Sequence, residues 1–124
     1  MGYAKNIMGA GIPAAAAAAA DTVSSVATGL TAAGTTQGTA LAITADVNFI
    51  STVGASSGVQ IYNGVIGDSV FIMNDGGANA LTVYPPTGSK FNNLATNAGF
   101  TLNANTPVWC IKVTATRWFA ILSA

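Results

Sequence analysis

Apolar segments and turn-forming residues alternate along the chain from residue 26 onward. Breakers such as Asn63-Gly64, Asp75-Gly76-Gly77 and Pro85-Pro86-Thr87-Gly88 separate short apolar runs. Short strands between such turns are typical of an all-β domain. The pattern predicts strands over residues 26–33, 39–44, 47–53, 58–62, 68–74, 80–84, 98–103, 107–114 and 117–123. No long helical periodicity interrupts them, so we expect a Gly-punctuated antiparallel β-sandwich or barrel, jelly-roll-like in type.

The first part of the chain follows a different pattern. Residues 1–33 are rich in Ala and Gly and are expected to form an N-terminal arm, with the β domain over residues 34–124. Pro13 precedes the run Ala14–Ala20, and proline at the first turn followed by alanine predicts a short helix near residues 12–20. Two interpretations are open, a low-complexity tail and an arm that docks on a neighbour. The lack of charge in the alanine run favours docking.

The same N-terminal stretch has a third interpretation, a signal peptide with Lys5 ahead of an apolar core. Gly9, Gly11 and Pro13 weigh against it because they break the core where leucine is usual. The apolar run is also too short and too rich in alanine to predict a transmembrane helix.

Three predicted strands are apolar on both faces. They contain Val70-Phe71-Ile72-Met73, Val108-Trp109-Cys110-Ile111 and Trp118-Phe119-Ala120-Ile121-Leu122. A strand that meets water on one face alternates apolar with polar residues, so these strands predict that the outer face is covered too. The last two are expected to form a closing hairpin at the centre of the fold. The residues expected in core and subunit packing are Val108, Trp109, Ile111, Trp118, Phe119 and Ile121.

The low charge content indicates where such a fold would be found. Only 6% of the residues are charged, 51% are hydrophobic and the net charge is zero. A surface with so little charge favours a protein buried against copies of itself or in a larger assembly. Four scattered basic residues form no stripe for nucleic acid and no patch for an anionic membrane. The single cysteine, Cys110, excludes an internal disulfide and is expected to be a buried thiol.

The sequence offers little for catalysis or for metal binding. It contains no histidine and only four acidic residues, all aspartates beside predicted turns. Asp46, Asp68 and Asp75 are expected to bond nearby backbone N–H groups, and Asn74-Asp75-Gly76-Gly77 favours a hairpin turn over a calcium loop. We therefore expect no enzyme, no metal site and no cofactor.

Several segments together point to a known group of proteins. Asn79-Ala80-Leu81-Thr82-Val83-Tyr84-Pro85-Pro86 follows Gly67-Asp68-Ser69-Val70 and Asn74-Asp75-Gly76-Gly77. Ala95-Thr96-Asn97-Ala98-Gly99-Phe100 and an Asn105-Thr106 turn come next, then the Cys110 strand and Arg117-Trp118-Phe119-Ala120-Ile121-Leu122. With the opening Met8-Gly9-Ala10-Gly11-Ile12-Pro13 and its alanines, most of the chain resembles small virion structural proteins of tailed bacteriophages.

That resemblance implies a setting but no chemistry, because its motifs are turns and core strands. It implies a capsid decoration (cement) protein, homotrimeric, made in the host cytoplasm and placed on the capsid surface of the virion. Its partners would be other copies of itself and the major capsid protein. The residues expected in the capsid-docking arm are Ile7, Met8, Ile12 and Pro13. The alternative is a tail, neck or fibre component that binds a receptor or glycan through exposed aromatics such as Tyr62 and Tyr84.

Overall fold

The structure is a computed structural model that describes residues 25–122, and this part of the chain is all-β, without a helix. The helix predicted near residues 12–20 lies outside the described residues. Ten strands follow one another: β1 (Val26–Thr31), β2 (Leu41–Ala42), β3 (Val47–Thr52), β4 (Gly58–Gln60), β5 (Ser69–Asn74), β6 (Leu81–Tyr84), β7 (Lys90–Phe91), β8 (Phe100–Leu102), β9 (Pro107–Thr114) and β10 (Arg117–Leu122). Nine of them fall within the nine predicted segments, and the two-residue β7 was not predicted.

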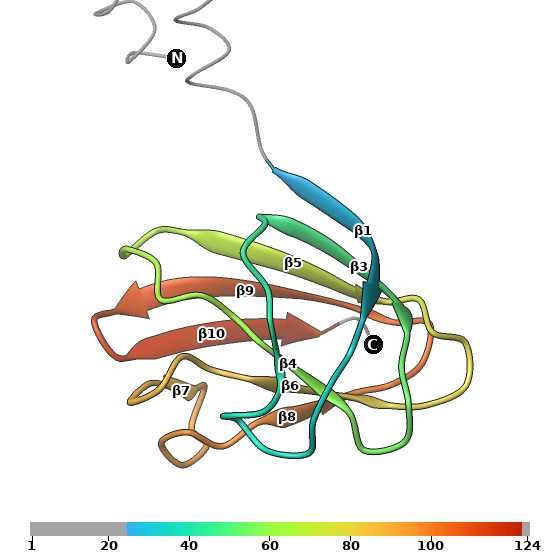
Figure 1. Ribbon diagram of the computed structural model, residues 1–124. Coiled ribbons are helices and arrows are strands. Elements are labelled where there is room, and N and C mark those ends of the chain that lie inside the picture. The colour runs from blue at the N-terminus through green and yellow to red at the C-terminus, as the bar shows by residue number, and fades with distance from the viewer. Residues whose placement is uncertain (1–24, 123–124) are drawn as a thin grey trace, which may run out of the picture.

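The first six strands wind between two sheets (Figure 1). One sheet has six strands in the order β1-β3-β5-β9-β10-β7, and the other has four in the order β2-β4-β6-β8. Consecutive strands therefore lie in different sheets, and each strand pairs in parallel with the next but one. Val26 lies opposite Val47, and Val47 opposite Phe71, so the chain returns to the same position after each coil. This arrangement is a β-solenoid of three coils.

The expected antiparallel sandwich or barrel of jelly-roll type is therefore wrong. Short strands between glycine-containing turns occur in both architectures, and the turns do not specify which strands pair. Here the connections lead across to the opposite sheet instead of folding back as hairpins, so β1–β3, β3–β5, β2–β4 and β4–β6 are all parallel pairs. Residues 26–31 of the expected arm form β1, the outermost strand of the larger sheet.

The last strands close one end of the solenoid. β8 pairs antiparallel with β6, and β9 pairs antiparallel with β5, so both sheets of the third coil are covered at their open edge. β9 and β10 form the predicted closing hairpin near the middle of the larger sheet, with Phe119 opposite Ile111 and Ala120 opposite Cys110. Terminal strands of this kind cap a solenoid, because the last coil would otherwise leave the backbone N–H and C=O groups of its edge unpaired.

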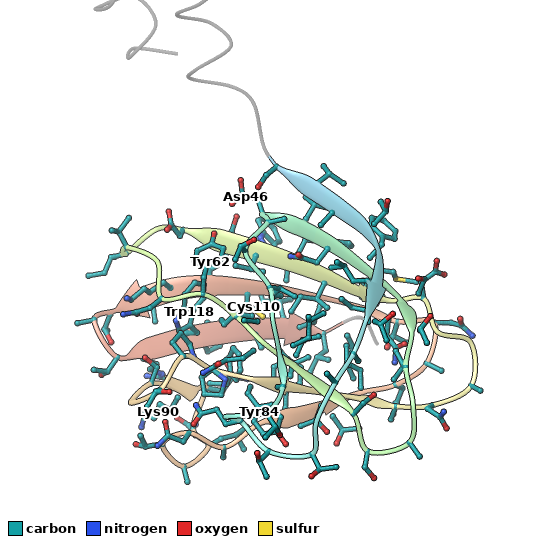
Figure 2. The ribbon with its side chains drawn as sticks, viewed as in Figure 1. Asp46, Tyr62, Tyr84, Lys90, Cys110 and Trp118 are labelled. Carbon is teal, nitrogen blue, oxygen red and sulfur yellow. The ribbon has the colours of Figure 1, made fainter. Side chains whose placement is uncertain are left out.

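The core lies between the two sheets. Alternation puts Val70 and Ile72 of β5 inside, facing Leu81 and Val83 of β6, and all four are fully buried. Phe91 packs edge-on against Phe100 with ring centroids 4.8 Å apart. Figure 2 places Cys110 and Trp118 in the same layer. The two sheets thus share one apolar interior, and their outer faces are left to interact with solvent or partners.

Candidate interaction surface

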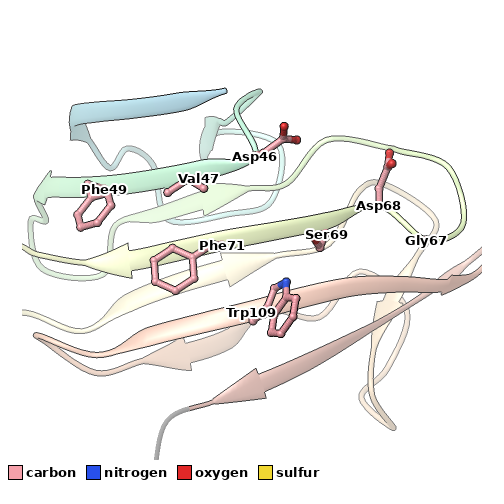
Figure 3. A pocket seen from close by; sticks show the side chains of 8 residues that line it. All are labelled: Asp46, Val47, Phe49, Gly67, Asp68, Ser69, Phe71 and Trp109. Atoms are coloured by element: carbon pink, nitrogen blue, oxygen red, sulfur yellow. The ribbon is translucent and has the colours of Figure 1, made fainter. Parts of the chain in front are cut away.

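The outer face of the six-stranded sheet carries a continuous set of apolar side chains. Strand pairing aligns Val47, Phe71, Trp109 and Ile121 side by side across β3, β5, β9 and β10. Ring centroids of Phe49 and Phe71 lie 6.2 Å apart. Figure 3 shows Phe49, Phe71 and Trp109 projecting from three neighbouring strands on this side of the sheet.

Rows on either side extend this set. One aligns Phe49, Met73 and Pro107, and the other aligns Ile111 with Phe119. We call the whole set the aromatic face, and its residues are Val47, Phe49, Phe71, Met73, Pro107, Trp109, Ile111, Phe119 and Ile121. Trp109 is 50% exposed, Phe119 44% and Ile121 48%. Large apolar side chains that are half exposed on β9 and β10 and partly exposed on β3 and β5 are unusual for a subunit that stays alone in water.

The structure divides the six residues predicted for core and subunit packing into two groups. Val108 and Trp118 point inward and are buried in the core. The other four, Trp109, Ile111, Phe119 and Ile121, belong to the aromatic face. The four residues predicted for the docking arm, Ile7, Met8, Ile12 and Pro13, lie outside the described residues.

Sequence reasoning missed the contribution of β3 to this face. Val47-Asn48-Phe49-Ile50 would ordinarily predict the aromatic ring inside and the amide outside. The structure reverses this: Asn48 is fully buried, where its Nδ2 donates to the carbonyl oxygen of Ala45 at 2.8 Å, and Phe49 points outward. The only available signal was Ile50, which shares its face with Asn48 by the two-residue period.

A hollow lies at one end of the aromatic face. It has a volume of about 570 Å³, and its walls include Val47, Phe71 and Trp109, with Asp46 and Asp68 at the strand starts (Figure 3). A smaller hollow of about 170 Å³ lies between Trp109 and Ile121. Both are open depressions in the same apolar surface.

The two aspartates at this end hold the structure together. Asp68 Oδ2 accepts from the backbone N–H of Val65 at 2.9 Å, so the predicted turn-capping role is confirmed for Asp68. Asp46 instead makes distant contacts: its carboxylate accepts from Ser25 N at 3.3 Å and from the Tyr62 hydroxyl at 3.1 Å. Burial, the hydrogen bond to Asp46 and the charges of Asp46 and Asp68 raise the pKa of Tyr62 to about 12.

A buried lysine supports the same end from within. The ammonium group of Lys112 donates to the carbonyl oxygen of Gly64 at 2.6 Å and to Asn63 Oδ1 at 3.0 Å. Its backbone also pairs with the loop, because Gly67 N donates to Lys112 O and Lys112 N to Asp68 O, both at 2.9 Å. Lys112 therefore fixes the loop between β4 and β5. It leaves the aromatic face free of its charge.

The outer face of the four-stranded sheet is different in character. Thr82 and Thr101 lie opposite each other there, with Gln60 beside Tyr84 on the next strand pair. A Cβ atom added at Gly58 would lie 2.8 Å from the Tyr84 ring, and one added at Gly99 would lie 2.9 Å from it. The ring thus covers both glycines, and its hydroxyl donates to Thr35 O at 3.1 Å. Tyr62 is likewise occupied, edge-on against Trp118 at 6.3 Å.

The remaining candidates for chemistry are quickly placed. Cys110 is fully buried as predicted, and burial raises the pKa of its thiol to about 12, far above a reactive range. Within residues 25–122, no three His, Cys, Asp or Glu side chains come together in a way that would hold a metal ion. The same residues contain no helix that would cross a bilayer.

No protein-family model matches the chain, and no curated protein matches it.

Proposed function

We propose that this chain is a structural component of a multisubunit assembly, and specifically a decoration protein on the capsid surface of a tailed bacteriophage. The observation that carries the proposal is the aromatic face, a half-exposed apolar surface on a chain of which only 6% is charged. An exposed apolar surface of this kind marks a site that a partner covers. The resemblance of the sequence to phage virion proteins supplies the setting.

The proposed mechanism is cementing. Apolar area buried between neighbouring subunits stabilises a shell by roughly 25 cal/mol per Å², so an interface of about 1,000 Å² opposes opening with a gross gain of about 25 kcal/mol. Part of that gain is lost in ordering the contacting segments. In this scheme three copies form a trimer, and the arm residues Ile7, Met8, Ile12 and Pro13 contact the major capsid protein.

The alternative role in receptor or glycan binding receives less support. It relied on Tyr62 and Tyr84 as exposed rings, and both are engaged in contacts within the chain. Sugar-binding platforms need an aromatic ring whose face is open, and the half-exposed ring of Trp109 belongs to the aromatic face, which the proposal assigns to protein contacts. We therefore put forward decoration of the shell as the single candidate function.

The first test is the copy number of this chain relative to the major capsid protein in purified particles, by quantitative mass spectrometry. The proposal expects hundreds of copies, in a simple ratio to the capsid subunits. A handful of copies per particle would contradict it and move the chain to the tail, neck or fibre.

The second test concerns the arm. A full-length variant with Ile7→Ser, Met8→Ser and Ile12→Ser should remain folded and lose at least about tenfold in affinity for undecorated shells. Cosedimentation with shells measures binding, and circular dichroism checks the fold. The matched control carries Val65→Ser and Ile66→Ser, two exposed apolar positions in a loop outside both the arm and the aromatic face. If the variant with Ile7→Ser, Met8→Ser and Ile12→Ser still fills the binding sites on shells, the proposed role of the arm is wrong.

A further inference from the structure

We propose that the aromatic face is the surface through which copies of this chain bind one another. The inference rests on the proposed function, because it names the partner that covers the apolar surface before or during assembly. It commits to a second copy of this chain as the occupant. Area, charge and the condition of the sheet edge each support that choice.

The exposed area matches what a subunit interface needs. An aromatic side chain contributes roughly 150–250 Å² when it passes from exposed to buried. With Trp109 and Phe119 half exposed, Ile121 beside them and the half-buried rows behind, the face offers on the order of 500 Å² of apolar surface. A stable interface buries about 800 Å² per partner, part of it in a polar rim. The aromatic face is therefore large enough to be the apolar centre of one.

The distribution of charge allows two copies of this face to meet. Within residues 25–122, all the charged side chains except Asp75 lie at or near the end of the sheet where β3, β5 and β10 begin. At that end Lys112 turns inward and Arg117 donates to Asn93 Oδ1 at 3.3 Å. A charge buried in a contact between copies costs free energy unless an opposite charge of the other copy lies against it. The nine residues of the aromatic face carry no charge, so a contact between copies through them avoids this cost.

The edge of the larger sheet is a poorer site for a partner. Its edge strands are β1 and the two-residue β7, and a long unpaired edge strand such as β1 ordinarily invites strand addition. Here the register shifts between Ala27 and Leu30, where Gly29 has φ of +67°. A bulge in an edge strand interrupts the row of hydrogen-bonding groups that an added strand needs. Contact through the aromatic face uses side chains and does not depend on the backbone groups of this edge.

The test compares lysine substitutions on the two outer faces of the full chain. Phe119→Lys places a charge in the aromatic face, and Thr101→Lys places the same charge on an exposed position of the other sheet. Sedimentation equilibrium between about 1 and 100 µM measures the molecular mass. We expect the parent chain and Thr101→Lys to self-associate, and Phe119→Lys to raise the dissociation constant by about 100-fold or more.

Tryptophan fluorescence gives an independent readout. Trp118 is fully buried and Trp109 is half exposed, so a change in acrylamide quenching with dilution reports on Trp109. Quenching of the parent chain should increase as it dissociates. If Phe119→Lys fails to fold by circular dichroism, Trp109→Gln replaces it in the mass measurement, because that side chain is equally accessible and lies in the same face.

Three results would overturn the inference. A parent chain that stays monomeric at about 100 µM, with Trp109 open to quencher, would assign the face to another protein. A monomer with Trp109 shielded would assign it to the arm of the same chain. Equal loss of association in both lysine variants would place the contact elsewhere.

Shell binding, measured on the same variants, separates this inference from the proposed function. A parent chain that is monomeric and still decorates shells would leave the function standing and overturn the self-contact. A parent chain that forms an oligomer sensitive to Phe119→Lys but binds no shell would do the reverse. A dimer in place of a trimer supports the face as the contact and overturns only the proposed threefold arrangement.

Discussion

The two sheets share one core but present opposite outer faces. On the larger sheet the outward positions are Phe, Trp, Val, Met and Ile, and several remain half exposed. On the smaller sheet they are Thr, Gln and Gly, and the one large ring, Tyr84, lies over Gly58 and Gly99. The one large side chain on the outer face of the smaller sheet therefore packs against the sheet itself. The larger sheet leaves large apolar side chains half exposed, and this contrast, more than any single residue, is the reason we propose it as the interaction surface.

The contrast also shows how apolar content should be interpreted. About half of this chain is hydrophobic. The inward positions of both sheets account for a conventional core, and the largest exposed side chains outside it, Trp109 and Phe119, lie on one outer face, while Val65 and Ile66 are exposed in a loop. Apolar residues beyond what a core needs therefore have a definite place in the molecule. Substitutions that compare inside with outside, and one outer face with the other, test that division.

The largest expected effect is the difference in stability loss between an inward and an outward side chain of β5. Ile72→Ala removes a fully buried side chain and leaves a cavity, so the free energy of unfolding should fall by about 2–5 kcal/mol. Phe71→Ala, one residue away on the aromatic face and partly exposed, should cost the isolated subunit less, about 1–2 kcal/mol. Urea unfolding at concentrations where the chain is monomeric measures both. Equal losses would mean that the aromatic face stabilises the subunit itself.

A smaller effect is expected where Tyr84 covers the smaller sheet. In Gly58→Ala the added Cβ would lie 2.8 Å from both the Tyr84 ring and the carbonyl oxygen of Thr82, so the free energy of unfolding should fall by about 1–3 kcal/mol. Gly54→Ala is the control, because nothing lies within 4 Å of its added Cβ. The control should change stability by less than about 1 kcal/mol. A harmless Gly58→Ala would show that the ring does not need the glycine beneath it.

The smallest effect concerns Tyr62 at the charged end of the sheet. Its pKa is about 12 in the folded chain and 10.0 in an ordinary phenol, so the folded state holds this proton more tightly than the unfolded state. The resulting stabilisation is complete below pH 10 and is lost as the pH rises toward 12. Tyr62→Phe should therefore lose less stability than the parent chain between pH 10 and 12. The difference should be under about 1 kcal/mol, because solvent screens a partly exposed group.

Cys110 sets the background for that measurement. Its thiol pKa rises from 9.0 to about 12 on burial, so it too withdraws stability as the pH climbs through this range. Unfolding midpoints from pH 8 to 11.5 should be compared between Cys110→Ala and the double variant with Tyr62→Phe. Identical slopes in the two would contradict the proposed role of the tyrosine.

The sequence predicted strand positions well because strand formation depends on local features. Turn residues such as Asp75-Gly76-Gly77 and β-branched runs such as the one around Ile72 act within a few residues of themselves. The closing hairpin of β9 and β10 and the burial of Cys110 were predicted for the same reason. β7 was missed because Lys90 and Phe91 pair with β10 over only two residues, too few for a recognisable pattern.

Pairing partners were not predictable from the same features. Parallel pairing of β1, β3 and β5 depends on where each connection leads, and hydrophobic periodicity carries no information about that. The aromatic face was half predicted: two-sided strands pointed to Trp109 and Phe119. Phe49 was missed because Asn48 takes the inward position, where its Nδ2 donates to the carbonyl oxygens of Ala45 and Phe71.

The solenoid architecture allows the length of the subunit to vary with the number of coils. Each coil contacts only the coils beside it, and the antiparallel strands close one end without reference to how many coils precede them. Gaining or losing one coil would lengthen or shorten the subunit while preserving its cap and extending or trimming the same outer rows. A lineage built on this plan can change the length of its subunit and the area of its outer face by changing the number of coils, with no new fold required.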